Sequence, residues 1–175
     1  TLSATASTSE DGGTITYTAK LPDGVITNNA ITVTLNVGAN GETASNTNPA
    51  LTITIAAGQS SGTVDATVAR DNDDGSGEDK FIETDSLSAA ISGVSEANAG
   101  TAGSLENLTF DDTAQTTTIT NDNDEVEVTL SATASTSEDG GTITYTAKLP
   151  DGVITNNAIT VTLNVGANGE TASNT

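Results

Sequence analysis

Residues 31–37 read ITVTLNV, in which Ile31, Val33, Leu35 and Val37 alternate with polar residues. An apolar side chain at every second position is the pattern of a β-strand with one buried face. Threonine fills two of the polar positions, and its branched Cβ favours strands. This stretch therefore predicts a strand, and it defines the pattern that we follow along the rest of the chain.

The same alternation recurs throughout the sequence. The further runs are Ile15-Tyr17-Ala19, Leu51-Ile53-Ile55, Val64-Ala66-Val68, Leu87-Ala89-Ile91 and Val126-Val128-Leu130-Ala132-Ala134. The run AQTTTIT at 114–120 is compatible with either phase of alternation. Turn-forming Gly, Pro, Asn and Asp lie between the runs, and no segment has helical spacing. The pattern predicts an all-β protein.

The runs define seven strands in the first part of the chain. We expect them at 1–7, 14–20, 31–37, 50–56, 62–69, 86–92 and 114–120. Seven short strands with one solvated face each indicate a seven-stranded antiparallel immunoglobulin-like β-sandwich. The loop at 93–113 is long for such a fold. Its segment SLENLTF, residues 104–110, either adds an edge strand or packs as a flap.

The chain contains an internal repeat. Residues 1–47 recur without a change at 129–175, an offset of 128 residues. A unit of this length is a domain and far exceeds a solenoid repeat, which has roughly 20–50 residues. We expect a complete domain at 1–124, and in 125–175 the first three strands of the next, identical repeat.

The composition excludes several classes of function. With 24 acidic and 4 basic residues the formal net charge is −20, which repels phosphate backbones and anionic lipid. We therefore expect neither nucleic-acid binding nor direct membrane insertion, and no apolar run is long enough to span a bilayer. Residues 1–6 already have a strand-like pattern, and we do not expect them to form a signal peptide.

Four residue types with special chemistry are absent. The sequence has no Cys, His, Met or Trp, so it supplies no disulfide, no thiol chemistry and no histidine general base. Histidine-based transition-metal sites are excluded for the same reason. The expected core consists of small aliphatic side chains and threonine methyl groups, and it is thin.

Acidic residues gather in segments that the predicted topology brings to one end of the domain. The stretch VARDNDDGSGEDKFIETD at 68–85 holds seven carboxylates against Arg70 and Lys80. If the strands alternate in direction, it shares a pole with SEDGG at 9–13, GANGETASN at 38–46 and TNDND at 120–124. Like charges this close repel one another and oppose compact folding.

Two interpretations of this acidic pole stay open. Clustered carboxylates suit Ca²⁺, which takes six to eight oxygen ligands in flexible geometry, better than Mg²⁺, which requires a stricter octahedron. The segment DNDDG is not an EF-hand, because its Gly comes one position early and no helices flank it. The alternative is an acidic, solvated surface that binds no specific ion.

The order of the motifs resembles that of known families. SEDGGTITYTAKL, LTITIAAGQSSGTVDATV, FIETDSLSAAISG and TTTITNDND follow one another as in the extender repeats of large RTX-type bacterial adhesins and in the Calx-β domain. The resemblance covers the whole repeat. It implies a calcium-binding sandwich that acts as a spacer in a secreted adhesin, tethering bacteria to surfaces and in biofilms.

The resemblance also implies a ligand set. Matched to the Calx-β pattern, the metal ligands lie in the first acidic loop, in the long acidic stretch and after the last strand. They are Glu10, then Asp71, Asp73, Asp74 and Glu83 or Asp85, then Asp122 and Asp124. We add Asp11, the neighbour of Glu10, to the expected ligands. The chain departs from the pattern in the loop after 31–37, which offers only Glu42.

Two classes of function compete. The first is a structural spacer whose partners are neighbouring repeats of the same chain, with no small-molecule substrate. The second is a module that binds glycan or protein, although sugar-binding faces usually carry exposed aromatic residues and this chain has only two Tyr and two Phe. We expect no enzyme activity, because carboxylates alone supply no substrate cleft.

Overall fold

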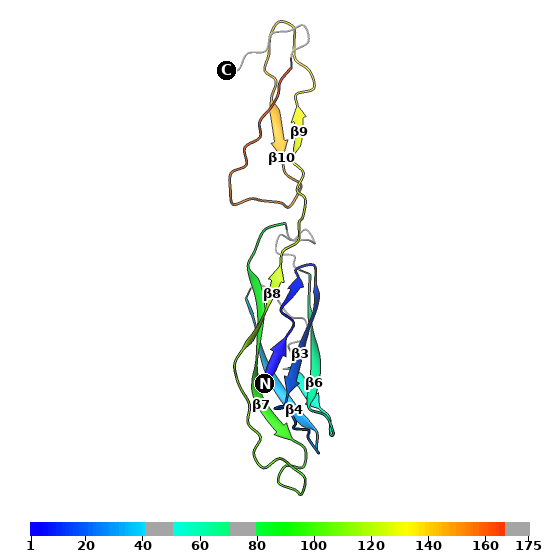
Figure 1. The fold of residues 1–175 in the computed structure, drawn as a ribbon. Coiled ribbons are helices and arrows are strands. Elements are labelled where there is room, and N and C mark those ends of the chain that lie inside the picture. The colour runs from blue at the N-terminus through cyan, green and yellow to red at the C-terminus, as the bar shows by residue number, and fades with distance from the viewer. Residues whose placement is uncertain (41–50, 71–79, 167–175) are drawn as a thin grey trace. The chain divides into compact units, whose positions relative to one another are not determined.

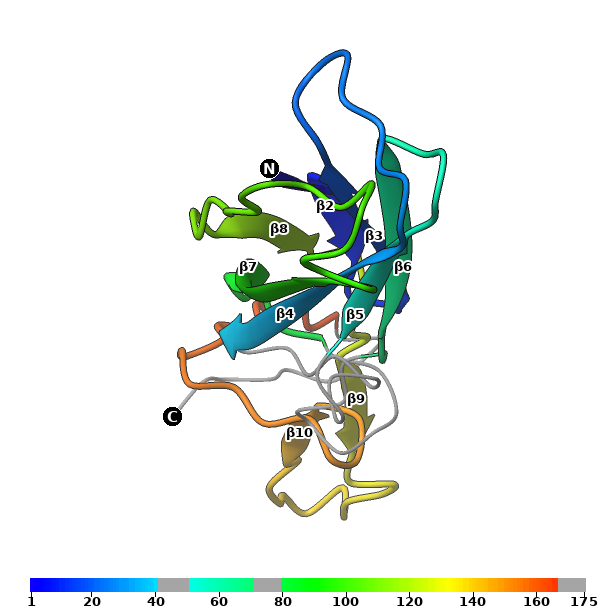
Figure 2. The ribbon, with the colours of Figure 1, turned by 90° about the horizontal axis from the view of Figure 1, so that it is seen from below.

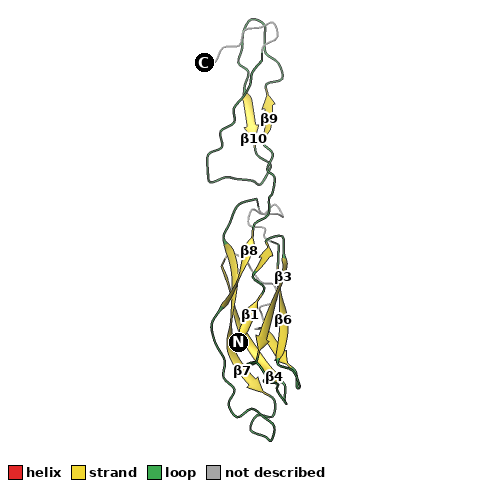
Figure 3. Cartoon of the chain, in the orientation of Figure 1, coloured by secondary structure: helices red, strands yellow, loops and turns green. Residues whose placement is uncertain are grey.

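The computed structural model describes residues 1–40, 51–70 and 80–166 (Figure 1). Over those ranges the protein is all-β and contains no helix, as Figure 3 shows, which confirms the predicted class. No segment there is a helix long and apolar enough to cross a membrane. The chain divides into two compact units, Thr1–Asp124 and Glu125–Thr175.

Ten strands form in the described ranges: eight in the first unit, where seven were expected, and two in the second, where three were expected. The first unit contains β1 (Leu2–Ala4), β2 (Ser7–Ser9), β3 (Gly13–Lys20), β4 (Ile31–Asn40), β5 (Thr52–Ile55), β6 (Ser61–Val68), β7 (Asp85–Glu96) and β8 (Gln115–Thr120). The second contains β9 (Thr129–Ala132) and β10 (Tyr145–Lys148).

The first predicted strand, 1–7, is wrong because the chain changes sheets within it. β1 pairs antiparallel with β3, whereas β2 pairs parallel with β8. The switch at Thr5 is held from both sides: its Oγ1 accepts a hydrogen bond from the Thr16 amide (3.0 Å), and its carbonyl oxygen accepts one from Thr117 Oγ1 (2.6 Å).

Two sheets build the first unit. One has three strands in the order β1-β3-β6, and the other has five in the order β2-β8-β7-β4-β5. Figure 2 shows β3 and β6 on one side and β8, β7 and β4 on the other. β4 pairs with β7 from Ile31↔Glu96 to Asn40↔Ser86, and its register shifts between Thr34 and Leu35.

One hydrophobic core lies between the two sheets. The alternation of β4 is confirmed, since Ile31, Val33 and Leu35 are buried. The sequence left open which residues of 114–120 face the core. In β8 these are Thr117 and Ile119, which are both buried. The full set of buried apolar residues is Leu2, Ile15, Tyr17, Ala19, Leu21, Ile31, Val33, Leu35, Leu51, Ile53, Ile55, Ala66, Val68, Leu87, Ala89, Ile91 and Ile119.

The segment 104–110 is not an edge strand. Residues 105–110 have no strand structure, but Leu105 and Leu108 pack against the core as partly buried side chains. Its anchor is Glu96 at the end of β7, whose Oε2 accepts a hydrogen bond from the Leu105 amide (2.9 Å). Of the two expectations for this segment, the packed flap is the one that the structure shows.

The second unit reproduces only the local part of the first. β9 and β10 pair with Tyr145 opposite Ala132, the same register as Tyr17 opposite Ala4. Residues 159–166, whose identical counterparts form much of β4, are not in a strand. Of the three strands expected in this unit, two form, because β4 owes its pairing to β5 and β7 and the described residues of the second unit include no counterparts of these strands.

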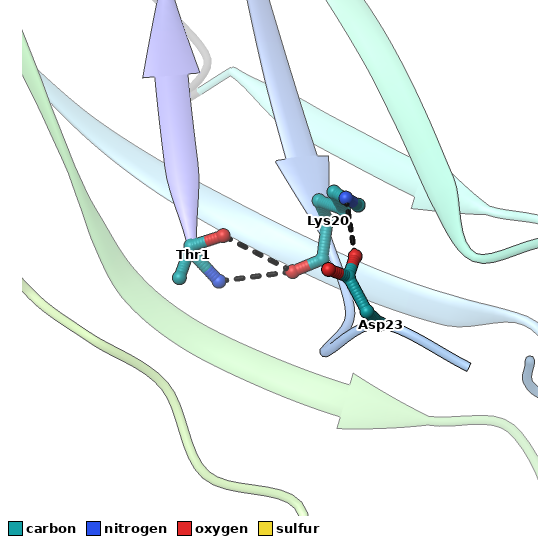
Figure 4. A network of polar contacts seen from close by, with 3 residues as sticks. All are labelled: Thr1, Lys20 and Asp23. Carbon is teal, nitrogen blue, oxygen red and sulfur yellow. Dashed lines mark hydrogen bonds and ion pairs between the residues drawn. The ribbon is translucent and has the colours of Figure 1, made fainter. Parts of the chain in front are cut away.

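A short polar network closes the β1–β3 pair. Figure 4 shows Thr1, Lys20 and Asp23, in which the Thr1 amino group donates to the Lys20 carbonyl (3.0 Å) and Lys20 Nζ contacts Asp23 Oδ1 (2.6 Å). The hydrogen bond and the charge of Lys20 lower the pKa of Asp23. The same ion pair forms between Lys148 and Asp151 (2.5 Å), because it depends only on residues three positions apart.

Candidate metal centre

The parallel pairing of β2 with β8 builds one end of the first unit. The pairing runs to Ser9↔Thr120, and the Glu10 amide donates to the Thr120 carbonyl oxygen (3.1 Å). Both strands run in the same direction and stop at the same level. The residues that follow them, Glu10 and Asp11 on one side and 121–124 on the other, are therefore neighbours.

Three carboxylates meet at this end. Oxygen atoms of Glu10, Asp122 and Asp124 all lie within 4.8 Å of one another. Glu10 is only 8 % exposed, and its Oε1 accepts a hydrogen bond from the Asp122 amide (2.6 Å). This bond joins residues 112 positions apart and fixes the exit of β8 against the turn after β2.

The carboxylates interact strongly with one another. The pKa of Asp122 is raised to about 6, first by a hydrogen bond with the Asp11 side chain, then by partial desolvation and by the charges of Asp11 and Asp124. A further contribution is a hydrogen bond with Glu10. The raised pKa means that crowding of negative charges in the folded state favours the neutral, protonated form of Asp122. A cation at the same place would relieve the same repulsion.

The turn that carries Glu10 and Asp11 is fixed by local contacts. The Asp11 amide donates to Ser9 Oγ (3.2 Å), and Gly12 has a positive φ of 96°. A Cβ at Gly12 would lie 3.2 Å from the Val68 carbonyl oxygen, so the turn packs directly on the end of β6. Arg70, just beyond β6, forms an ion pair with Asp11 Oδ1 (3.0 Å).

Asn121 ties the acidic stretch to this centre. Its Oδ1 accepts a hydrogen bond from the Glu83 amide (2.7 Å), and its Nδ2 donates to the Glu83 carbonyl oxygen (2.8 Å). The segment before β7 is thereby held beside the exit of β8. Sequence reasoning missed Asn121, because it counted carboxylates alone; the amide inside TNDND was the available signal.

The structure brings some of the predicted ligands together and leaves others apart. Glu10, Asp122 and Asp124 form the three-carboxylate group, and Asp11 contacts Asp122. Glu83 is anchored next to the group through its backbone. Asp85 lies within β7 opposite Ile119 and is not part of the group. Asp71, Asp73, Asp74 and Glu42 lie outside the described residues.

The donor set fits a hard divalent cation. All three ligands offer oxygen, and Ca²⁺–oxygen distances of about 2.3–2.6 Å allow two ligand oxygens to lie up to roughly 5 Å apart. The oxygens of this group are within that limit. The group therefore meets the chemical and geometric conditions for part of a calcium coordination shell, with further ligands needed to reach six to eight.

Comparison with known proteins identifies one family. The sequence model of the LapA domain matches residues 1–122, which covers the described strands β1 to β8. No curated protein matches the chain. The match overturns the assignment to RTX-type extender repeats and to Calx-β, which rested on the order of short motifs that many repetitive β-domains can share.

Proposed function

The chain belongs to the LapA domain family, which places it among adhesin-related proteins of the cell surface or extracellular space, and we propose that its repeat is a structural spacer. In this role tandem copies form a rod that projects an adhesive tip from a secreted bacterial protein, for surface attachment or biofilm formation. The exact recurrence of residues 1–47 at 129–175 supports tandem repetition.

We further propose that the first unit has the immunoglobulin-like arrangement. In that fold the second and fifth strands share one sheet, and the third, sixth and seventh share the other. Counting β1 and β2 as one strand that changes sheets, β3 and β6 share the first sheet and β4, β7 and β8 share the second. The supporting observation is this division of strands between the sheets, from which only the fourth strand, β5, departs by lying beside β4 in the second sheet.

The observation that carries the functional proposal is the meeting of Glu10, Asp122 and Asp124 where the first unit ends. We propose that they hold calcium there. A bound Ca²⁺ would supply positive charge that offsets the repulsion among these carboxylates. Glu10 would keep the turn after β2 fixed, Asp122 would keep the exit of β8 in place, and the chain would leave the domain in one direction.

Calorimetric titration of the full chain with CaCl₂ tests this proposal. We expect a dissociation constant of about 0.1–1 mM, the range of extracellular calcium modules. Glu10→Gln should weaken binding about tenfold, because an amide lacks the charge of a carboxylate. Glu138→Gln is the matched control, since Glu138 has the same sequence neighbours and belongs to no such group in the described part of the second unit.

Two outcomes would contradict the proposal. If Glu10→Gln and Glu138→Gln bind calcium equally well, the three-carboxylate group is not the site. If small-angle scattering gives the same distance distribution in calcium and in chelator, the ion does not stiffen the rod. A glycan array that captures the full chain would favour the competing ligand-binding function.

A further inference from the structure

A short segment of the flap has the sequence of a sugar-attachment site. Residues 107–109 read Asn-Leu-Thr, which is the Asn-X-Ser/Thr pattern, with X other than Pro, that accepts N-linked sugar in secreted proteins. Of the 16 asparagines in the sequence, only Asn107 is followed by this pattern. Three residues coincide easily by chance, so the structural surroundings have to decide whether a transferase can use the segment.

The flap turns the asparagine and the threonine of this segment outward. Asn107 and Thr109 are exposed, whereas Leu108 between them is partly buried and packs against the core. Along an extended chain, adjacent side chains point to opposite sides and residues two positions apart point to the same side. The packing of Leu108 therefore presents the Asn107 amide and the Thr109 hydroxyl together to solvent.

The backbone of the segment is also accessible. Residues 105–110 belong to no strand, so a transferase can bind them without opening a sheet. The segment is nevertheless held in place, because the Leu105 amide donates to Glu96 Oε2 (2.9 Å) and Leu105 packs against the core with Leu108. Surface loops fixed on a rigid scaffold are where recognition usually takes place.

The side-chain amide of Asn107 takes no part in holding the fold. Neither Asn107 nor Thr109 forms a side-chain hydrogen bond with another residue in the described ranges. The amides of Asn28, Asn29 and Asn121, in contrast, each donate a hydrogen bond that fixes a neighbouring segment. Modification of Asn107 would therefore break no contact of the folded domain.

Space for a sugar lies next to this amide. A hollow of about 560 Å³ opens beside the flap, and its lining includes Asn107, Ser95, Thr101 and Leu105. The hydroxyl groups of Ser95 and Thr101 can donate and accept hydrogen bonds, as sugar hydroxyls do. A sugar attached to Asn107 has room on the surface and polar groups within reach.

We propose that Asn107 is a site of N-linked glycosylation. The donor is a sugar diphosphate, carried by a nucleotide or by a lipid. Asn107 Nδ2 forms a bond to the anomeric carbon of the sugar, while the bond from that carbon to the diphosphate oxygen breaks. The diphosphate leaves with the electron pair, and one amide proton passes to a base of the transferase. The atoms balance without an oxidant or a reductant.

This site is separate from the calcium centre. The flap is anchored at Glu96, where β7 ends, whereas the carboxylate group lies near Glu83, just before β7 begins. In the proposed tandem rod, each repeat would carry one bulky, hydrated sugar at the same place. The attachment itself depends neither on calcium nor on the spacer role, so the failure of one proposal leaves the other standing.

Mass spectrometry of the full chain, isolated from the cells that make it, tests the proposal. Trypsin leaves Asn107 in the fragment 81–148. We expect this fragment to carry the mass of a sugar, and its fragmentation spectrum to place that sugar on residue 107. A single hexose or hexosamine indicates a nucleotide carrier, and a preassembled oligosaccharide indicates a lipid carrier.

Four variants made in the same cells show what the transferase recognises. Asn107→Gln and Thr109→Ala should each lose the sugar completely, because the first lacks the acceptor and the second lacks the hydroxyl group of the pattern. Thr109→Ser keeps that hydroxyl and should retain the sugar. Asn36→Gln is the control: Asn36 is exposed but is followed by Val-Gly, and its replacement should leave the sugar in place.

Three results would overturn the proposal. The first is a fragment 81–148 that carries no sugar in the wild-type chain. The second is sugar that remains in Thr109→Ala, which would mean that the Asn-X-Thr pattern is not what the transferase recognises. The third is sugar that remains in Asn107→Gln and disappears in Thr109→Ala, which would place it on the threonine hydroxyl.

Discussion

Asn121 holds the backbone of Glu83 at both its amide and its carbonyl group, over 2.7 Å and 2.8 Å. The side-chain amide thus imitates one residue of a neighbouring strand and extends the contact between β7 and β8 past the last backbone pair, Asp85↔Ile119. This contact joins the acidic stretch to the carboxylates that follow β8.

Replacement of Asn121 should therefore loosen the end of the domain. Asn121→Ala leaves two partly buried backbone groups without their partner, and we expect the free energy of unfolding to fall by about 1–3 kcal/mol. Urea denaturation of the first unit measures the change. Asn28→Ala is the control: it removes one exposed hydrogen bond to Gly103, and its effect should be clearly smaller. Equal effects would show that Asn121 has no special role.

The acidic centre predicts a pH dependence. The folded-state pKa of Asp122 is raised from 3.8 to about 6, so the folded chain binds a proton that the unfolded chain has released between these values. The free energy of unfolding should be highest below about pH 4 and should fall as pH rises through about 6. Urea titrations from pH 4 to 7 in calcium-free buffer measure this slope.

Two further series of urea titrations show whether Asp122 causes this pH dependence of the free energy of unfolding. Asp122→Asn removes the titrating group, so its stability should change less over the same pH range. In 10 mM CaCl₂ the wild-type slope should flatten or reverse, because the ion requires deprotonated ligands. A variant slope equal to that of the wild type would show that the general repulsion of a chain of net charge −20, and not Asp122, sets the pH dependence.

Gly12 should be intolerant of a side chain. It has a φ of 96°, and a Cβ there would approach the Val68 carbonyl oxygen to 3.2 Å. We expect Gly12→Ala to destabilise the first unit by about 1–3 kcal/mol, measured as the shift of its urea midpoint. Gly140→Ala is matched in sequence and has a φ of 107°, but a Cβ there meets nothing within 4 Å. It should leave the first unit unchanged.

The two copies also permit a matched test of the core. Ile15→Ala empties space between the sheets and should lower the free energy of unfolding by about 2–5 kcal/mol, because Ile15 is fully buried. Ile143→Ala makes the same change at a half-exposed position and should have little effect on the stability of the first unit. If both variants lower the free energy of unfolding by similar amounts, the burial of Ile15 between the sheets is not the cause of its effect.

The repeat shows how far local sequence goes in predicting this fold. Alternation in ITVTLNV at 31–37 correctly predicts a strand with one buried face. The identical sequence at 159–165 forms no strand. The alternation therefore predicts which face of a strand would be buried, but the strand forms only where neighbouring strands pair with it. β4 exists because β5 and β7 lie on either side of it.

The change of sheet at Thr5 and the carboxylate group also combine features that the local sequence predicts with features that distant residues determine. Alternation continues through residues 1–7, whereas the change of sheet at Thr5 depends on Thr16 and on Thr117, 112 residues away. Strand polarity was sufficient to bring Glu10, Asp122 and Asp124 together. Strand polarity alone did not remove Asp85 from the predicted ligands. The apolar pattern predicted a strand that begins at residue 86, whereas β7 begins at Asp85 and includes this residue.

The parallel pair of β2 and β8 determines how the domain responds to tension. A pull on the two ends of the first unit draws β2 back along its own axis and β8 forward along its own. Their cross-links are the bonds from Thr118 N to Ala6 O (3.0 Å), Glu10 N to Thr120 O (3.1 Å), Thr120 Oγ1 to Thr8 O (2.9 Å) and Thr117 Oγ1 to Thr5 O (2.6 Å). All of them lie across the direction of pull, so they are loaded in shear and must break together. In a hairpin that is pulled at its two ends, the hydrogen bonds break one after another. The bonds between β2 and β8 share the load, so we expect a higher unfolding force for this domain.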